Sequence, residues 1–181
     1  MWIALVVIVV LLLVWLIAVY NNLVSLKMRV KNAWAQIDTQ LKRRFDLIPN
    51  LVETVKGYAA HEQGTLEKVI AARNTYTSAN TVEEKAKANN ELTSTLKSIF
   101  ALGEAYPELK ANENFLALQT ELAGTEDKVA YSRQFYNDTV QMYNTAIMKF
   151  PNNLVAGMFG HKEEPFFTID EAEKEPVKVQ F

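Results

Sequence analysis

Residues 2–19 read WIALVVIVVLLLVWLIAV and carry no charged side chain. As a helix, this apolar run would be about 27 Å long at roughly 1.5 Å per residue, close to the roughly 30 Å hydrocarbon core of a bilayer. Trp2 lies at one end of the run, and Trp15 and Tyr20 lie near the other. Amphipathic rings favour the headgroup zones at such ends. The run therefore predicts a transmembrane helix.

The same run has two other interpretations, a cleaved signal peptide and a buried core helix. A signal peptide begins with basic residues and ends with small ones before its cleavage site. Residues 1–26 contain no Lys or Arg, and the stretch 16–18 (Leu-Ile-Ala) offers one small residue. A core helix of a soluble protein would show polar residues on one face. We therefore expect residues 1–22 to be an uncleaved anchor.

Positive charges follow the apolar run, with Lys27, Arg29 and Lys31 close to it. The positive-inside rule places such a flank in the cytoplasm. The sequence therefore favours a single-pass protein of the inner or plasma membrane with a cytoplasmic body.

Apolar residues continue at helical spacing beyond the anchor, in steps of three or four. They are Leu23, Leu26, Val30, Trp34, Ile37, Leu41, Phe45 and Ile48. No Gly or Pro separates this stripe from the apolar run. The pattern predicts one continuous helix that ends near Pro49, because proline disfavours helix at the residue before it.

Two further helices are predicted in the middle of the chain. The first begins at Pro49 and reaches about Tyr76, with a weak point at 61–64 and a polar link over 74–80. The second begins at Thr81, because Thr81 and Glu84 have the spacing of a capping box. It is expected to end between Gly103 and Pro107.

The last predicted helix has a heptad-like period that ends at Pro151, with steps alternating between four and three. Its stripe positions are Phe115, Gln119, Leu122, Glu126, Val129, Arg133, Tyr136, Val140, Tyr143, Ile147 and Phe150. Such a coiled-coil-like seam needs partner helices. The sequence thus predicts an all-α fold, in which the transmembrane helix continues into an elongated antiparallel four-helix bundle over 23–150.

Residues 151–181 differ in character and are predicted to form an irregular, extended C-terminal tail. Prolines and glycines punctuate the tail, and 170–178 is dense in charge. Its short apolar pieces, Leu154-Val155, Met158-Phe159 and Phe166-Phe167, could dock on another surface.

Several stretches closely resemble the LemA family of bacterial membrane proteins. They are residues 20–24 (YNNLV), 33–62 (AWAQIDTQLKRRFDLIPNLVETVKGYAAHE), 106–151 (from YPELK to MKFP) and 165–167 (PFF). The resemblance covers nearly the whole chain, and the block 41–52 (LKRRFDLIPNLV) is quite specific. It implies a single N-terminal span followed by a helical bundle. It brings no established activity, cofactor or catalytic residue.

Polar residues interrupt the apolar stripes, namely Gln119, Glu126 and Arg133 in the last helix and Arg73 in an earlier one. One interpretation is an ionic site for a ligand or for catalysis. The other, which we favour, is a buried network that fixes helix register. The ligand interpretation requires a concave, water-accessible pocket at Glu126, Arg133 and Arg73.

The sequence offers no motif for catalysis, a metal or a cofactor, so we predict no catalytic, cofactor-binding or metal-ligating residue. The chain has no Cys and two His, His61 and His161, and neither has a Glu three residues earlier. Di-metal helical bundles need such Glu-x-x-His pairs. Gly-rich phosphate loops and nucleophile elbows are also missing from the sequence.

The basic run 42–44 (KRR) could bind lipid headgroups or nucleic acid, or it could be a solvated helix face. We favour the solvated face, because Asp38 and Asp46 each lie four residues from Lys42. The net charge of −2 gives no general reason to expect nucleic acid as a partner.

These features predict a non-enzymatic, membrane-anchored scaffold or interaction protein that organises membranes or envelope assembly. Its expected partners are the lipid bilayer, further copies of itself and another membrane protein. Apolar residues off the main stripe (Val24, Met28 and Leu47) and the unattached tail motivate this view. One alternative is an accessory or regulatory subunit of a membrane protein such as a protease. A bundle enzyme or ligand binder is the other.

Overall fold

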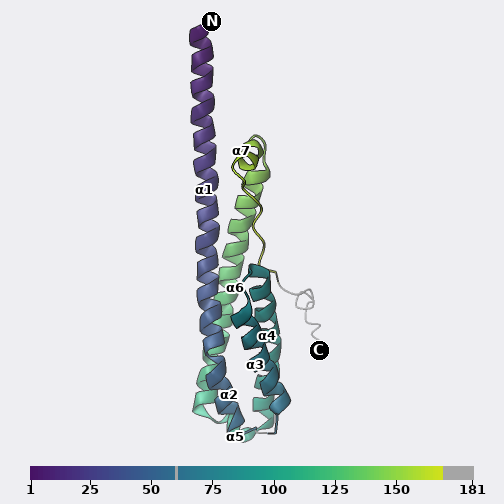
Figure 1. The fold of residues 1–181 in the computed structure, drawn as a ribbon. Helices are drawn as coiled ribbons and strands as arrows, with labels where there is room; N and C mark the ends of the chain where they lie inside the picture. Colours follow the sequence, from purple (N-terminus) through teal and green to yellow (C-terminus); the bar gives the residue numbers. More distant parts are fainter. Residues whose placement is uncertain (60, 169–181) are drawn as a thin grey trace, which may run out of the picture. The chain divides into compact units, whose positions relative to one another are not determined.

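A computed structural model describes residues 1–59 and 61–168 (Figure 1). Within these residues the chain is helical and has no strand. The helices are α1 (Trp2–Asp46), α2 (Ile48–Lys56), α3 (Gln63–Ser78), α4 (Val82–Ala105), α5 (Pro107–Lys110), α6 (Glu113–Met148) and α7 (Asn152–Met158). The predicted all-α class is confirmed. The predicted four-helix count stays a prediction.

Helix α1 runs without a break from the apolar run to Asp46, as its pattern predicts. Residues 1–15 are all exposed, and the helix is long and apolar enough to cross a membrane. Leu23, Val30 and Ala33 are buried further along the same helix. The helix ends before Leu47, and Pro49 lies in the first turn of α2, where a missing N–H costs no hydrogen bond.

The single helix predicted from Pro49 to about Tyr76 is wrong, because the chain forms α2 and α3 with an interruption between them. The predicted polar link is also wrong in part, since α3 continues to Ser78. The hydroxyls of Thr75, Thr77 and Ser78 donate to backbone carbonyls four residues earlier. Tyr76 stacks on Phe45 with ring centroids 4.0 Å apart. Packing thus overrides the weak helix propensity of this stretch.

The predicted capping box at the start of α4 is confirmed. The amide of Glu84 donates to the Thr81 hydroxyl at 3.2 Å, and the Glu84 carboxylate accepts from the Thr81 amide at 3.1 Å. The amide of Asn80 donates to the same carboxylate at 2.7 Å. Backbone donors from Asn80 and Thr81 lower the pKa of Glu84.

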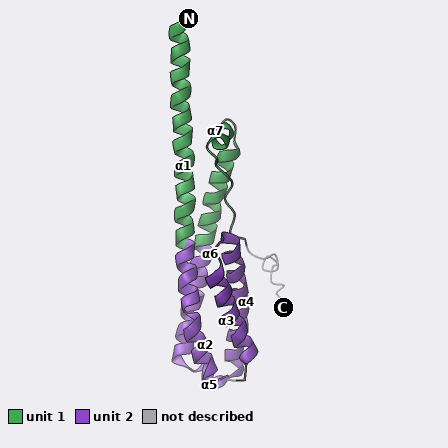
Figure 2. Cartoon of the chain, in the orientation of Figure 1, with its two compact units in different colours: residues 1–36, 132–166 green, residues 37–131, 167–181 purple. Residues whose placement is uncertain are grey.

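The described chain divides into two compact units (Figure 2). Unit 1 combines residues 1–36 with 132–166, and unit 2 combines 37–131 with 167 and 168. In unit 2, α3 and α4 pack side by side. Its apolar core draws on α1, α2, α3, α4, α5 and α6. A Cβ atom on Gly103 would lie 2.7 Å from the buried Phe115 ring, so glycine permits this close approach of α4 to that ring.

Helix α6 follows its predicted period closely. Its buried stripe residues are Phe115, Leu122, Val129, Tyr136, Val140, Tyr143 and Ile147. The last predicted position is wrong, because α6 ends at Met148 and Phe150 is 80% exposed. The chain leaves the helix before the heptad completes, so Phe150 no longer faces the packed side.

Candidate functional site

Arg44, near the end of α1, is the largest fully buried side chain of the described residues and is 2% exposed. The interpretation of the basic run 42–44 as a solvated face is therefore wrong for this residue. Arg44 lies three residues after Leu41 and four before Ile48, so helical spacing places it on the buried stripe. This spacing is the sequence feature from which the burial of Arg44 could have been predicted.

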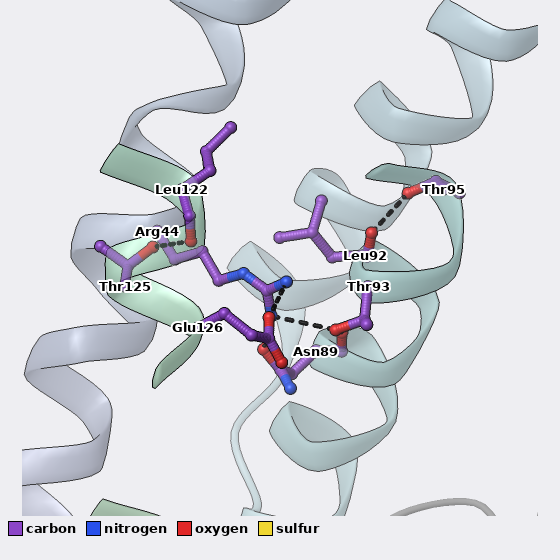
Figure 3. A network of polar contacts seen from close by, with 8 residues as sticks. All are labelled: Arg44, Asn89, Leu92, Thr93, Thr95, Leu122, Thr125 and Glu126. Carbon is purple, nitrogen blue, oxygen red and sulfur yellow. Dashed lines mark hydrogen bonds and ion pairs between the residues drawn. The ribbon is translucent and has the colours of Figure 1, made fainter. Parts of the chain in front are cut away.

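The Arg44 guanidinium joins three helices of unit 2 (Figure 3). Its Nη1 donates to Asn89 Oδ1 at 2.5 Å and to Thr93 Oγ1 at 3.1 Å, both on α4. Its Nη2 forms an ion pair with the Glu126 carboxylate on α6. We call Arg44, Asn89, Thr93 and Glu126 the Arg44 cluster. Because the guanidinium has a fixed planar fork of donors, the cluster also constrains the register of α1, α4 and α6.

The helices supply these partners through their local spacing. Asn89 and Thr93 are one turn apart on α4, so their side chains lie on the same face. The Thr93 hydroxyl also donates to the Asn89 carbonyl at 3.1 Å, which holds its oxygen in place. Glu126 lies on the stripe of α6, next to Thr125, whose buried hydroxyl donates to the Leu122 carbonyl at 2.8 Å. The hydroxyls of Thr93 and Thr125 therefore each have a hydrogen-bond acceptor, as burial of a hydroxyl favours.

A second set of polar contacts in unit 2 involves Asp38 of α1. Its carboxylate pairs with Lys85 and accepts the Tyr76 hydroxyl at 3.3 Å. Burial, followed by the charge of Asp38, raises the pKa of Tyr76 well above its usual range, so the phenol stays protonated. Arg43, which is exposed, pairs with Glu121 at 2.9 Å. Arg43 and Arg44 therefore each have a glutamate partner on α6.

The four polar stripe residues of the sequence analysis are placed as follows. Gln119, Glu126, Arg73 and Arg133 are all partly buried. The cation beside Glu126 is Arg44, for which the sequence favours a solvated face. The predicted ionic network therefore includes the correct carboxylate, Glu126, but its arginine partner is Arg44 and not Arg73 or Arg133.

The contacts of the Arg44 cluster hold three helices together. The cluster contains a permanently charged guanidinium, an amide, a hydroxyl that donates to the Asn89 carbonyl, and one carboxylate that pairs with the guanidinium. Among residues 1–59 and 61–168, no three His, Asp or Glu side chains gather as a metal site would require.

A neutral polar cluster lies in unit 1, where residues 161–165 run back along α6 (Figure 1). We call these residues the return segment. The Asn144 amide donates to the Glu164 carbonyl and accepts from the Glu164 amide, both at 2.9 Å. The Tyr136 hydroxyl donates to the Pro165 carbonyl at 2.8 Å. The idea of an unattached tail is therefore wrong for 152–167, and its residues from 169 onward lie outside the described residues.

His161 and Tyr143 complete this neutral cluster, with the hydroxyl 3.0 Å from Nδ1. Burial, and then the nearby charge of Lys27, lowers the pKa of His161. Burial, and then the charge of Glu164, raises the pKa of Tyr143. Both shifts favour the uncharged forms, so a neutral imidazole and a neutral phenol share the hydrogen bond. Lys27 also pairs with Glu164 at 3.6 Å.

Comparison with known proteins adds family information. The model of the LemA family matches residues 33–181, well over half of the chain. "Protein LemA" of Metamycoplasma hominis is 28% identical over 85% of this chain and 71% of its own length. "Magnetosome protein MamQ 2" of Paramagnetospirillum magneticum is 25% identical over 87% of this chain and 68% of its own. "Magnetosome protein MamQ" of Magnetospirillum gryphiswaldense is 22% identical over the same shares, 87% and 68%.

Proposed function

The chain belongs to the LemA family, and from that premise we propose that it is a membrane-anchored helical scaffold that self-associates at the membrane. The names of its family and relatives are not enzyme names. The Arg44 cluster supports a structural role, because its polar groups bond to one another and join three helices.

The observation that carries the proposal is the unbroken course of α1. The helix begins with an exposed apolar run and continues, without Gly or Pro, into buried positions such as Leu23 and Val30. Exposed apolar surface of this extent is unfavourable in water, whereas lipid covers it at no such cost. The family match begins at Ala33, so support for the anchor comes from the apolar run of this chain itself.

The proposed orientation places the helical body in the cytoplasm. Lys27, Arg29 and Lys31 follow the apolar run, and the positive-inside rule keeps such charges on the cytoplasmic side. Accessibility of single introduced cysteines to a membrane-impermeant thiol reagent in intact cells tests this orientation, because the natural chain has none.

Exposed apolar side chains outside the anchor support self-association. Val24 and Met28 on α1 are 37% and 49% exposed, and Phe135 and Met142 on α6 are 47% and 59% exposed. All four belong to unit 1. Leu47, which the sequence also places off the main stripe, instead packs against the core of unit 2 and offers little free surface.

The alternative within this reading is an accessory or regulatory subunit of another membrane protein, and the same exposed residues would then contact that protein. The mass of the full-length protein extracted from its own membrane separates the two. We expect particles that are multiples of 20.5 kDa beyond the lipid or detergent mass. A stoichiometric second protein would favour the accessory role. Monomers without a companion would overturn both.

Matched variants make the mass measurement specific. Met28→Ser and Phe135→Ser remove exposed apolar contacts without creating a cavity, so they should reduce the particle mass if these faces join copies. Gln141→Ser, at an exposed polar position of α6, is the control and should leave the mass unchanged.

A further inference from the structure

The turn that follows α6 exposes an unusual amount of apolar surface. Residues 150–160, which we call the α7 tip, carry no charged side chain. Phe150, Leu154, Met158 and Phe159 are 80%, 58%, 70% and 49% exposed. Soluble surfaces rarely gather so many large apolar side chains in one short segment without a function.

The α7 tip is held in a defined conformation, so this exposure is not a feature of a loose end. Val155 and Ala156 are buried, whereas Leu154 and Met158 lie one turn apart on the outward face of α7. The His161 amide donates to the Ala156 carbonyl at 2.9 Å and the Gly160 amide to Gly157 at 3.4 Å. Together with a φ of 68° at Gly160, these bonds form a Schellman motif that ends the helix.

The α7 tip lies beside the end of the apolar run of α1, within the same unit. The rings of Tyr20 and Phe159 have centroids 4.6 Å apart. Other parts of the protein begin to bury α1 within the apolar run itself, since Leu16 and Val19 are already partly buried. Tyr20 directly follows the run, at the depth where aromatic rings favour the membrane interface. Contact with Tyr20 therefore brings the tip to that depth.

From this juxtaposition we propose that the α7 tip is a second membrane contact, which inserts Phe150, Leu154 and Met158 into the headgroup and upper acyl region of the bilayer that α1 crosses. The occupant is lipid rather than protein, because the tip continues the surface of the apolar run at its end. The absence of charge over 150–160 permits shallow burial, and Lys149 and Lys162 flank it as cations that anionic headgroups attract. This inference rests on the proposed anchor.

Lipid contact at the α7 tip would restrain the protein in a way that a single helix does not. One span leaves the body free to rotate about the helix axis and to tilt. A second contact at the interface would oppose both motions and so present the rest of unit 1 in one orientation. That would favour ordered assembly in the membrane plane.

Single cysteines in this Cys-free chain provide the test. An environment-sensitive fluorophore is attached to the cysteine of each of four full-length variants, Val10→Cys, Leu154→Cys, Met158→Cys and Gln141→Cys. Each is reconstituted into phosphatidylcholine–phosphatidylglycerol vesicles and quenched by lipids with a nitroxide at the headgroup or on the acyl chain, or by aqueous iodide. All four positions are exposed, so labelling need not disturb packing.

Labels at Leu154 and Met158 should show blue-shifted emission and lose intensity with shallow nitroxide lipids. The Val10 label should be quenched by acyl-chain nitroxides, and the Gln141 label by iodide. If iodide quenches the tip labels as it quenches the Gln141 label, while lipid nitroxides quench the Val10 label, then the α7 tip does not contact the membrane but the anchor is supported. If Val10 is also quenched by iodide, the anchor fails and the inference with it. Tip labels shielded from both kinds of quencher would indicate protein cover and overturn the inference.

A charge substitution checks that the tip side chains themselves enter the lipid. Leu154→Asp in the Met158→Cys protein should return the label toward water, because an exposed carboxylate resists transfer into the interface and is repelled by anionic headgroups. Leu154→Ile is the matched control and should keep the lipid quenching. Unchanged quenching in the Asp variant would overturn the proposed insertion of Leu154.

Discussion

Unit 2 buries a charged guanidinium, whereas unit 1 buries neutral phenols and an amide. In unit 2 the donors of Arg44 meet side-chain oxygens of Asn89, Thr93 and Glu126. In unit 1 the side chains of Tyr136 and Asn144 meet backbone groups of the return segment. The first cluster joins three helices through side chains, and the second attaches an irregular segment to one helix.

The two clusters show that attaching an irregular segment to a helix and linking packed helices require different polar groups. A return segment has unpaired backbone N–H and C=O groups, and neutral side chains satisfy them at small cost. Packed helices have already satisfied their backbone, so a buried polar link between them must come from side chains. A charged link costs much more to desolvate, and its loss leaves polar partners without a bond. We therefore expect unit 2 to be far more sensitive to the loss of its cluster than unit 1.

The largest effect is expected for Arg44→Ala. This change empties the volume of a fully buried side chain and removes the donors to Asn89 and Thr93, so the free energy of unfolding should fall by about 3 kcal/mol. Urea unfolding of the full-length protein in detergent, followed by circular dichroism, measures the loss. Arg43→Ala is the matched control, because Arg43 is exposed and its pair with Glu121 should contribute less than about 1 kcal/mol. Equal effects of the two variants would refute a special role for Arg44.

The second effect is expected for Asn144→Ala in unit 1. The amide of Asn144 makes two hydrogen bonds to Glu164, and truncation should cost about 1–2 kcal/mol, because water can reach the partly exposed Glu164. Hydrogen exchange should accelerate locally at the amides of 161–164 and leave the amides of 89–93 unchanged. Gln141→Ala, at an exposed polar position on α6, is the control. Faster exchange in both segments would contradict the local attachment that the structure indicates.

Arg44→Met asks whether the charge or the volume of Arg44 stabilises unit 2. Replacing a buried ionic group by an apolar one of similar length is often close to neutral for stability. We expect the loss to be smaller than for Arg44→Ala by at least about 1 kcal/mol, with the difference read from the same urea midpoints. If Met is as damaging as Ala, the hydrogen bonds rather than the volume stabilise the unit, and the contrast with unit 1 becomes sharper.

The sequence predicts the helices of this protein well because their periods are long and regular. The stripe of α1 and the heptads of α6 each place buried residues correctly, and the capping box fixes the start of α4. The ends of elements are less predictable. Tyr76 keeps its stretch helical through a ring stack on Phe45, a residue distant in sequence. The predicted burial of Phe150 is wrong because α6 ends two residues earlier.

The two clusters were predictable to different degrees. Arg44 has the spacing of a buried residue, but a charge is rarely buried without a partner, and the partner Asn89 lies 45 positions away. Glu126 stands out in its stripe, yet the stripe alone does not identify its cation. The contacts of the return segment were not predictable, because the partners of Tyr136 and Asn144 there are backbone groups, which every sequence contains.

The smallest effect concerns His161 and acid. Its pKa is lowered from the usual 6.5, first by burial and then by Lys27, so the folded form binds its proton less tightly than the unfolded chain. Between these two pKa values the unfolded chain carries more protons, and stability must therefore fall as the pH falls below about 6.5. We expect amides of 161–164 to lose protection at pH 5.5, after correction for intrinsic exchange, while those of 89–93 keep theirs.

Two variants separate His161 from other titrating groups. His161→Gln removes the imidazole and should abolish the acid sensitivity of the return segment. Lys27→Gln removes the cation that helps to depress the pKa, so it should weaken the sensitivity without abolishing it, because burial is the larger cause. Loss of protection in acid that persists in His161→Gln would transfer the effect to a carboxylate such as Glu164. The stability of the return segment would then depend on a charged group, so the two units would differ less in the kind of polar contact that stabilises them.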